Sequence, residues 1–333
     1  MSRATALATV AAISLVVLAV LAGAGAARLR SAPSPPPSPS PSAVVATPVP
    51  TEPPDTGPLV FRQPLSAGCV AGDGVYVVSD GGGIGRFDGE RWQLIDPTLR
   101  SLVAAACRGS ELVAVGGAGG VVTIDDAART IRTDAVQTDD LRGISLLPDG
   151  ALAAGRRGTV IRQTAAGWFP HAAGLAEDFE AIVAFGPESA WIVGVGGAAY
   201  RLEEAGWRAI PSGAGATLRA VIGPRVDDLV AVGDGGTILR YRAGWVAVPP
   251  PAPFTLRAAV MVGTATWIVG DRGTVLRLEA GAGPPMPIDL GTTCTLRGIF
   301  AQGETIWIVG SDGTGAAVWR IAGGATRQWG ACP

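Results

Sequence analysis

The sequence is poor in charge and almost free of histidine. Charged residues make up 16% of its 333 residues, the formal net charge is −2, and His171 is the single histidine. Binding to a phosphate backbone needs a basic surface, which this composition does not supply. One histidine excludes a polyhistidine metal site and argues against histidine-based nucleophilic catalysis. We therefore expect no nucleic-acid partner, no metal and no cofactor.

The amino-terminal segment is apolar. Residues 4–27 carry no charge and consist mostly of Ala, Val and Leu, which is enough to span a bilayer, since a span needs roughly 20 apolar residues. Ala22, Ala24 and Ala26 also resemble the small-residue pattern of a cleaved signal peptide. We predict a signal anchor or signal peptide in residues 1–30, and the length of the apolar run slightly favours an uncleaved membrane anchor.

A proline-rich segment follows the apolar one. Residues 31–58 contain eleven prolines, and proline favours the extended polyproline II conformation. We predict a disordered Pro/Ser-rich linker here, acting as a spacer between a membrane and a domain that starts near residue 59.

Residues 59–333 repeat one pattern seven times. Its clearest copy is Val232–Arg240, in which two apolar runs flank the turn Gly233-Asp234-Gly235-Gly236. The second residue of each copy lies at positions 79, 116, 155, 194, 233, 270 and 310. A second marker, Leu or Phe followed by a charged, a small and an apolar residue, keeps the same period, as does a tryptophan that closes most repeats. A period near 39 residues is typical of propeller blades.

Each repeat is expected to hold four short strands. In the fifth repeat we place them at about 218–223, 228–232, 237–242 and 245–248, with a glycine turn at 233–236 that supplies the positive φ of a tight hairpin. Seven blades of about 39 residues fit the stretch from Leu65 to Pro333. We predict an all-β fold, a seven-bladed β-propeller of four-stranded antiparallel blades.

The repeat resembles a known propeller family. The run Val232–Arg240 followed by Gly244-Trp245 is similar to repeats of the photosystem II assembly/stability factor-like propellers, within the group that has bacterial-neuraminidase-type repeats. The resemblance covers all seven repeats, whereas the Trp-Asp and Gly-His dipeptides of WD40 repeats are missing. In the photosynthetic members, the resemblance implies an assembly chaperone that binds a membrane-protein partner through a basic patch on one propeller face. For this chain we take from it only a non-enzymatic protein that binds a partner.

The neuraminidase relatives raise the question of catalysis. A sialidase uses arginines to hold a carboxylate and a tyrosine nucleophile assisted by a glutamate. Tyr76, Tyr200 and Tyr241 are the three tyrosines of the chain, and we expect the first two inside regular strands, the third at a strand end, and no tyrosine–glutamate pair beside the arginines. We therefore predict that the protein is not an enzyme.

Arginine recurs near the start of each predicted inner strand. The candidates for a partner-binding or anion-binding ring at the channel mouth are Arg100, Arg142, Arg219, Arg257 and Arg297, with Glu180 in the third copy of the marker. Converging arginines attract a carboxylate, a phosphate or an acidic peptide. The alternative is a structural role, in which each arginine pairs with a turn aspartate: Asp80, Asp234, Asp271 or Asp312.

Four cysteines are the disulfide candidates: Cys69, Cys107, Cys294 and Cys332. We favour Cys294–Cys332, because no strand exchange fastens the last blade to the first and Cys332 is the penultimate residue. Cys69 and Cys107 lie on inner strands of adjacent blades and either pair or remain buried thiols. No Cys-x-x-Cys spacing exists, which disfavours zinc.

These observations lead to one functional expectation with two alternatives. We expect a non-catalytic scaffold outside the cytoplasm, in the periplasm or cell envelope, membrane-anchored or secreted, that docks a protein partner or anionic group on a propeller face. The first alternative is a neuraminidase-like protein that binds or hydrolyses a glycan. The second is a structural envelope component without a specific ligand.

Overall fold

The computed structural model describes residues 46–48, 63–95, 101–136, 139–172, 174–281 and 283–332. The predicted anchor and most of the predicted linker lie outside these ranges. Within them, no helix is long and apolar enough to cross a membrane.

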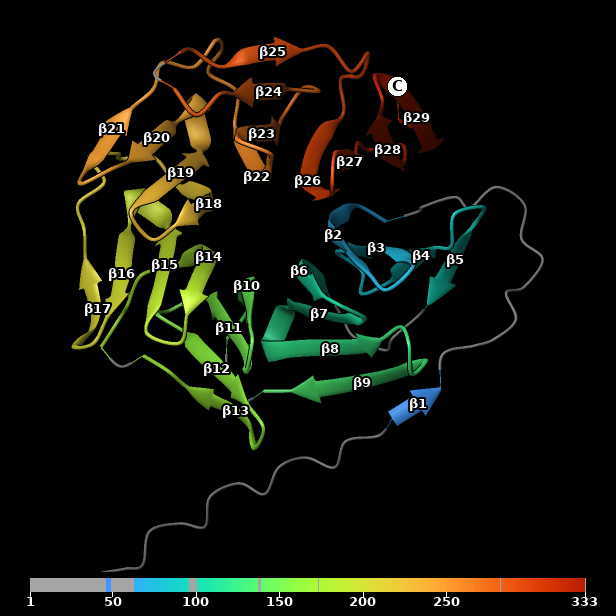
Figure 1. Ribbon diagram of the computed structural model, residues 1–333, viewed down its shortest axis with the longest axis horizontal. Coiled ribbons are helices and arrows are strands. Elements are labelled where there is room, and N and C mark those ends of the chain that lie inside the picture. Colours follow the sequence, from blue (N-terminus) through green and yellow to red (C-terminus); the bar gives the residue numbers. More distant parts are fainter. Residues whose placement is uncertain are drawn as a thin grey trace, which may run out of the picture. The chain divides into compact units, whose positions relative to one another are not determined.

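Apart from three short 3-10 turns, the regular secondary structure of the described chain is all β-strand, arranged as seven antiparallel sheets around a central channel (Figure 1). Blade 1 contains β2 (Leu65–Ala71), β3 (Gly74–Ser79), β4 (Ile84–Phe87) and β5 (Trp92–Ile95). Blade 2 contains β6 (Leu102–Arg108), β7 (Glu111–Gly116), the short 3-10 turn η1 (Gly117–Gly119), β8 (Gly120–Asp125) and β9 (Thr130–Ala135). Blade 3 contains β10 (Leu141–Leu147), β11 (Gly150–Gly155), β12 (Val160–Thr164) and β13 (Gly167–Pro170).

The remaining four blades follow in the same order around the ring. Blade 4 contains β14 (Phe179–Gly186), β15 (Ser189–Gly194), η2 (Val195–Gly197), β16 (Ala199–Glu203) and β17 (Gly206–Ala209). Blade 5 contains β18 (Leu218–Arg225), β19 (Asp228–Gly233), η3 (Asp234–Gly236), β20 (Ile238–Tyr241) and β21 (Trp245–Ala247). Blade 6 contains β22 (Leu256–Val262), β23 (Ala265–Gly270), β24 (Val275–Leu278) and β25 (Met286–Ile288). Blade 7 contains β26 (Thr295–Gln302), β27 (Thr305–Ser311), β28 (Ala316–Ala322) and β29 (Ala325–Gly330).

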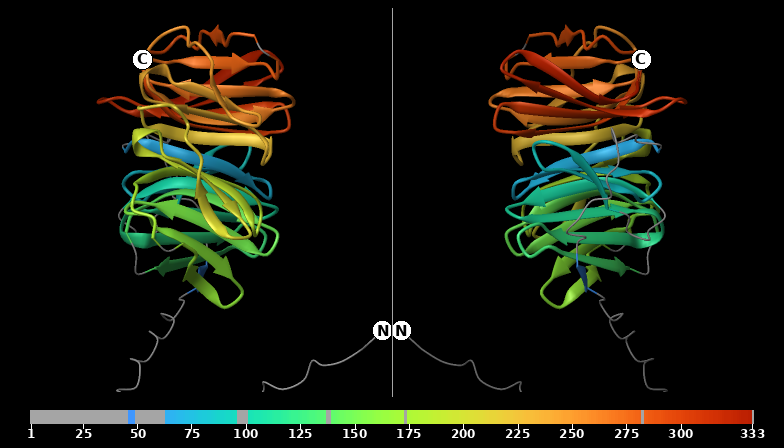
Figure 2. Two further views of the ribbon diagram at one scale, coloured as in Figure 1. Left: turned by 90° about the vertical axis from the view of Figure 1, so that its left-hand side faces the viewer. Right: turned by 90° about the vertical axis from the view of Figure 1, so that its right-hand side faces the viewer.

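The predicted fold class, a seven-bladed propeller, is confirmed. In each blade the first strand lines the channel and the fourth lies on the outer rim, and the side views show the blades as layers of short strands (Figures 1 and 2). Blade 2 has a fifth strand, β1 (Ala46–Pro48), which pairs antiparallel with β9. This strand falls inside the range predicted as linker.

The core lies between blades, because a blade has two apolar faces. β3 is buried along its whole length. Val75 and Val77 pack toward blade 7 beside Trp307, whereas Tyr76 and Val78 pack toward blade 2 beside Leu112. Alternate residues of a strand point to opposite faces of the sheet. Because both faces of the blade are buried, the sequence of a second strand is a continuous apolar run and does not alternate between polar and apolar residues.

The second strand ends in a glycine because the backbone at the start of the inner strand lies too close for a side chain. Gly233 has an extended backbone with φ −170°. A Cβ added there would lie 2.0 Å from the backbone oxygen of Thr217, the residue before β18. That same oxygen accepts a 2.9 Å hydrogen bond from the N–H of Asp234. The glycine therefore lets the turn after the second strand bond to the start of the inner strand.

Both disulfides suggested by the cysteine positions are formed. Cys294 is joined to Cys332 and Cys69 to Cys107, each pair spanning 38 residues. The second bond links the inner strands of blades 1 and 2, and the first connects the start of blade 7 to the end of the chain. Apart from β1 in blade 2, each described blade is built from consecutive strands, and no strand of the described chain is exchanged between blades 1 and 7, which agrees with the sequence.

Candidate functional site

A β-bulge lies near the start of the inner strand in each blade. A leucine or phenylalanine there pairs near the end of the second strand, and the register shifts immediately after it; in blade 5, Leu218 pairs with Gly233 and Ala220 with Val232. The seven residues in the shifted position are Ser66, Val103, Arg142, Glu180, Arg219, Arg257 and Arg297. A bulge re-aims a side chain, and we call these residues the bulge ring.

Blade 2 contributes a valine to the bulge ring. Leu102 pairs with Gly116 as Leu141 pairs with Gly155, so Val103 is the counterpart of Arg142. The sequence motif had placed Arg100 in this role, three residues too early, because Leu99 and Leu102 both fit its first position. Arg100 lies outside the described residues, so its contact with a partner stays a prediction.

Two of the predicted arginines are neutralised within their own blade. Arg219 Nε lies 2.5 Å from Asp234 Oδ1, and Arg257 Nε lies 2.5 Å from Asp271 Oδ1. The hydrogen bonds that Arg219 donates to Asp234 raise the pKa of Arg219 and lower the pKa of Asp234. This is the structural role that the sequence left open as an alternative.

The ring charges also act across blades. The pKa of Arg219 is further raised by Glu180 and by Asp271, which belong to blades 4 and 6, and the pKa of Asp234 is further lowered by Arg257. Such mutual influence means that these groups face one shared space.

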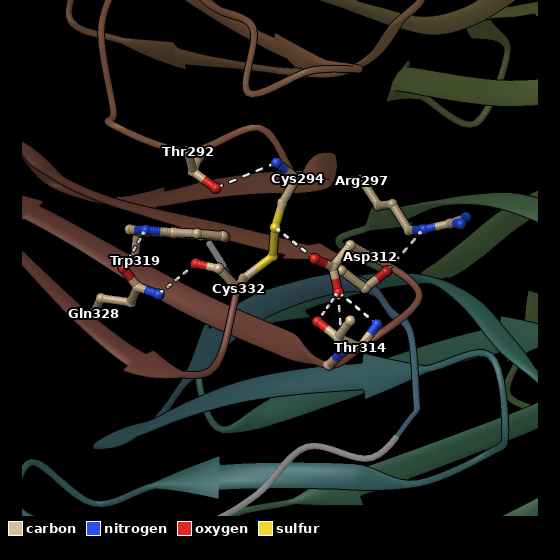
Figure 3. Close-up of a disulfide and its surroundings, with 10 residues drawn as sticks. Thr292, Cys294, Arg297, Asp312, Thr314, Trp319, Gln328 and Cys332 are labelled. Atoms are coloured by element: carbon tan, nitrogen blue, oxygen red, sulfur yellow. Dashed lines mark hydrogen bonds between the residues drawn. A yellow bond between two sulfur atoms is a disulfide. The ribbon is translucent and has the colours of Figure 1, made fainter.

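Arg297 has different partners from its counterparts Arg219 and Arg257. Its Nε donates to Ser311 Oγ at 3.3 Å, and the described residues supply no ion-pair partner (Figure 3). Burial lowers the pKa of Arg297, and Arg257 lowers it further, against the weaker opposing effects of Asp80 and Asp271. Asp312, its expected partner, instead accepts hydrogen bonds from the N–H and hydroxyl of Thr314, at 2.7 Å each, and from the N–H of Gly315.

Arg142 is loosely held. Its guanidinium lies 3.8 Å from Asp140, which also accepts the N–H of Ala118 at 3.0 Å and lies 3.6 Å from Arg156. Since Asp140 is shared among three donors, the positive charge of Arg142 is compensated less directly than that of Arg219, which donates two hydrogen bonds to Asp234.

The structure contains a tyrosine–glutamate pair that the sequence did not suggest. Tyr200, on β16, donates from its hydroxyl to Glu177 Oε1 at 2.7 Å. The two residues are 23 positions apart. Glu177 lies in the connection between β13 and β14, so no spacing in the repeat announces the pair. The hydrogen bond that the Tyr200 hydroxyl donates to Glu177 raises the pKa of Tyr200 to about 12. Among the described groups, no arginine is paired with either residue or contributes to either pKa shift.

Sequence reasoning also missed a second series of arginines. The third strand carries an arginine in six blades, as its third residue in five of them and as the fifth residue of the longer β28: Arg86, Arg162, Arg201, Arg240, Arg277 and Arg320. The period of the repeat would have revealed them, because Arg240 is part of its clearest copy. In blade 1, Arg86 is buried and bonds to Asp126 of blade 2 at 2.8 Å, while Tyr76 also donates to Asp126 at 2.7 Å.

The sulfur atoms near Asp312 are not metal ligands. Cys294, Asp312 and Cys332 lie close enough to suggest a metal site. The two sulfurs are bonded to each other, however (Figure 3), and a metal-binding cysteine must be a thiolate.

Comparison with known proteins supports the fold and no closer relationship. No family model and no curated protein sequence matches the chain. Among solved structures, the WD40 β-propeller domain of Doa1 matches with a TM-score of 0.66 and 10% identity, covering 78% of this chain and 94% of that one. A structure of YCF48 bound to D1 peptide matches with a TM-score of 0.64 and 15% identity, covering 83% of this chain and 96% of that one. The chain is a seven-bladed β-propeller.

Proposed function

We propose that the protein is a non-catalytic scaffold that docks a protein partner on the propeller face carrying the bulge ring. The observation that supports this most strongly is Arg297, a partly buried arginine at the channel mouth that lacks an ion pair among the described residues. A partner carboxylate placed there would form a charge-assisted hydrogen bond in a partly desolvated site.

In this proposal, only some of the predicted arginines of the bulge ring contact the partner. Arg219 and Arg257 already hold aspartates, so their contribution is to keep the mouth rigid. Arg142 and Arg297 are left to contact the partner. YCF48, which has this fold, is seen with a bound peptide, and its sequence family is the one that the repeats resemble. A peptide or protein ligand is therefore the class that we favour.

A location outside the cytoplasm is part of the proposal. The two disulfides support it, because disulfides persist in oxidising compartments such as the periplasm. The apolar segment at residues 1–30 supplies the membrane anchor or the signal peptide in this scheme. Non-reducing peptide mapping of protein from cells would oppose it if all four thiols were free.

Absence of catalysis is also proposed. Tyr200 with a pKa of about 12 is protonated at neutral pH, and a carboxylate-binding arginine does not accompany it among the described residues. Glycan hydrolysis, the alternative, predicts that a fluorogenic sialoside is cleaved and that Tyr200→Phe abolishes cleavage. No turnover of the sialoside is the result we expect.

The docking proposal is tested by crosslinked capture from intact cells. Arg297→Gln should reduce the crosslinked partner about three- to tenfold, the effect of losing one charge-assisted contact of 0.7–1.4 kcal/mol, with an unchanged melting temperature. The control is the double variant Arg219→Ala with Arg257→Ala, which should lower the melting temperature, because it leaves Asp234 and Asp271 unpaired. Undiminished capture by Arg297→Gln would remove the main support for the proposal.

A further inference from the structure

The outer edges of the blades differ in length and cover. The outermost strands β5, β13, β17, β21 and β25 have three or four residues. Only β9 and β29 have six. β9 is covered by β1, whereas β29 has no further strand on its outer side in the described chain and lies on the rim of the last blade (Figure 1).

Proline protects two of the shorter edges at one register position. Pro170 in β13 lies opposite Ile161, and Pro287 in β25 lies opposite Leu276. The corresponding residue of β29 is Gln328, opposite Trp319. Proline has no N–H and is accepted in a sheet only where that group would face away from the neighbouring strand. β29 contains no proline, so its outward-facing N–H groups can donate hydrogen bonds to an added strand.

The exposed face of this edge carries two like charges side by side. Arg320 on β28 and Arg327 on β29 are directly opposite each other, and both are exposed. Arg320 lies over the ring of Trp307 and Arg327 over the ring of Trp329. Within the described part of the chain, neither forms an ion pair. Like charges directly opposite each other destabilise a sheet.

Blade 4 shows how the same arrangement is neutralised. There, Arg201 and Arg208 are directly opposite, and Glu203 lies 3.7 Å from Arg201 and 2.6 Å from Arg208. The residue of blade 7 that corresponds to Glu203, two positions after the third-strand arginine, is Ala322. Blade 7 therefore keeps the arginine pair and lacks its carboxylate.

We propose that the outer edge of β29 binds an extended acidic segment of a partner protein as a fifth strand of blade 7. The backbone of β29 would supply the ladder hydrogen bonds, as β9 does for β1, and Asp or Glu side chains would lie against Arg320 and Arg327. Self-pairing of two copies is disfavoured, because it would bring further arginines to the same edge. The surface lies on the rim and is independent of the bulge ring.

The test measures binding of a fluorescein-labelled peptide of alternating threonine and glutamate to the purified full-length chain by fluorescence polarisation. We expect this peptide to bind and a threonine–lysine peptide not to bind. Arg327→Ala should weaken binding about three- to tenfold, which corresponds to about 0.7–1.4 kcal/mol, because it removes a charged side chain that would pair with an acidic residue of the peptide and leaves the backbone of β29 unchanged. Arg208→Ala, the matched change in blade 4, should leave it unchanged.

Two further variants separate charge from strand addition. Ala322→Glu supplies in blade 7 the carboxylate that Glu203 supplies in blade 4, so it should weaken peptide binding without lowering the melting temperature. Thr326→Pro removes an outward-facing backbone N–H from β29, so it should also weaken peptide binding. Among the described contacts, the Thr326 side chain has no hydrogen bond that this change would remove. Equal binding of the two peptides, or wild-type binding by Arg327→Ala, would overturn the proposal. So would a wild-type dimer in sedimentation that Thr326→Pro converts to a monomer, because a second copy would then occupy the edge.

Discussion

Arg86 and Asp126 form the most deeply buried ion pair of the described residues, with side chains 5% and 8% exposed. Tyr76 completes the group by donating to the same carboxylate oxygen. Burial alone would raise the pKa of Asp126, but the hydrogen bonds from Arg86 and Tyr76 outweigh it and hold that pKa below its usual value. The charges belong to blades 1 and 2, so the pair fixes how these two blades meet.

Asp126→Asn should be strongly destabilising. It leaves the Arg86 guanidinium buried without a counter-charge, and removal of one partner of a buried pair costs about 3–5 kcal/mol. Urea unfolding at neutral pH measures the loss. The control is Asp227→Asn in the exposed pair between Arg225 and Asp227, whose side chains are 67% and 64% exposed; its effect should be much smaller, because solvent screens an exposed ion pair. Similar losses in the two variants would contradict the assigned role.

The same carboxylate predicts a pH dependence. The folded-state pKa of Asp126 is depressed, so its stabilising contribution is present above the unfolded value of about 3.9 and is lost as the pH falls through the folded value. The difference in unfolding free energy between the wild type and Asp126→Asn should therefore be constant near neutral pH and shrink below about pH 4. A difference that persists unchanged at pH 2 would show that the carboxylate charge is not its source.

At the scale of elements, the repeat period predicts the strands well and the bulges poorly. The strands placed in the fifth repeat at 228–232 and 245–248 correspond to β19 and β21. Glycine spacing carries this information, because turns require particular backbone geometry. A bulge has no such residue requirement, so the leucine motif was misplaced in blade 2, where Leu99 and Leu102 compete and only the pairing of Leu102 with Gly116 decides.

Gly233→Ala tests the contact between the second-strand end and the inner strand. The new Cβ would lie 2.0 Å from a backbone oxygen of Thr217, and backbone cannot yield as a side chain can, so we expect a loss of about 1–3 kcal/mol in chemical denaturation. Gly215→Ala provides the control, since no heavy atom lies within 4 Å of its added Cβ. Tolerance of Gly233→Ala would mean that the turn can move away from β18 at little cost.

At the scale of the whole molecule, the ring has to close without strand exchange. The seam between blades 7 and 1 is aromatic: Phe87 and Trp92 of blade 1 pack against Trp307 and Trp329 of blade 7, with ring centroids 5.1–6.5 Å apart. The tryptophan that closes most repeats did not reveal this partnership, because residues more than 200 positions apart meet only once seven blades complete a circle. The Cys294–Cys332 disulfide holds the chain end of the same blade.

The two disulfides offer a matched measurement of ring closure. Both span 38 residues, so the chain-entropy contribution to stability should be the same for each, about 3–4 kcal/mol. Replacing Cys69 and Cys107 by serine removes this contribution alone, because blades 1 and 2 remain joined by the Arg86–Asp126 pair. Replacing Cys294 and Cys332 should cost more, because this disulfide ties the chain end after β29 to the start of β26, and without it β29, which carries the seam residue Trp329, is held by pairing and packing alone.

Guanidinium unfolding of both double variants gives the two losses, and hydrogen exchange reports where the structure opens. We expect the Cys294→Ser/Cys332→Ser variant to lose protection in β26 to β29 and in β2 to β5, the strands on the two sides of the seam, before the rest of the ring. Equal losses and uniform exchange would instead mean that the aromatic seam closes the propeller by itself. The disulfide would then only secure the last residues of the chain.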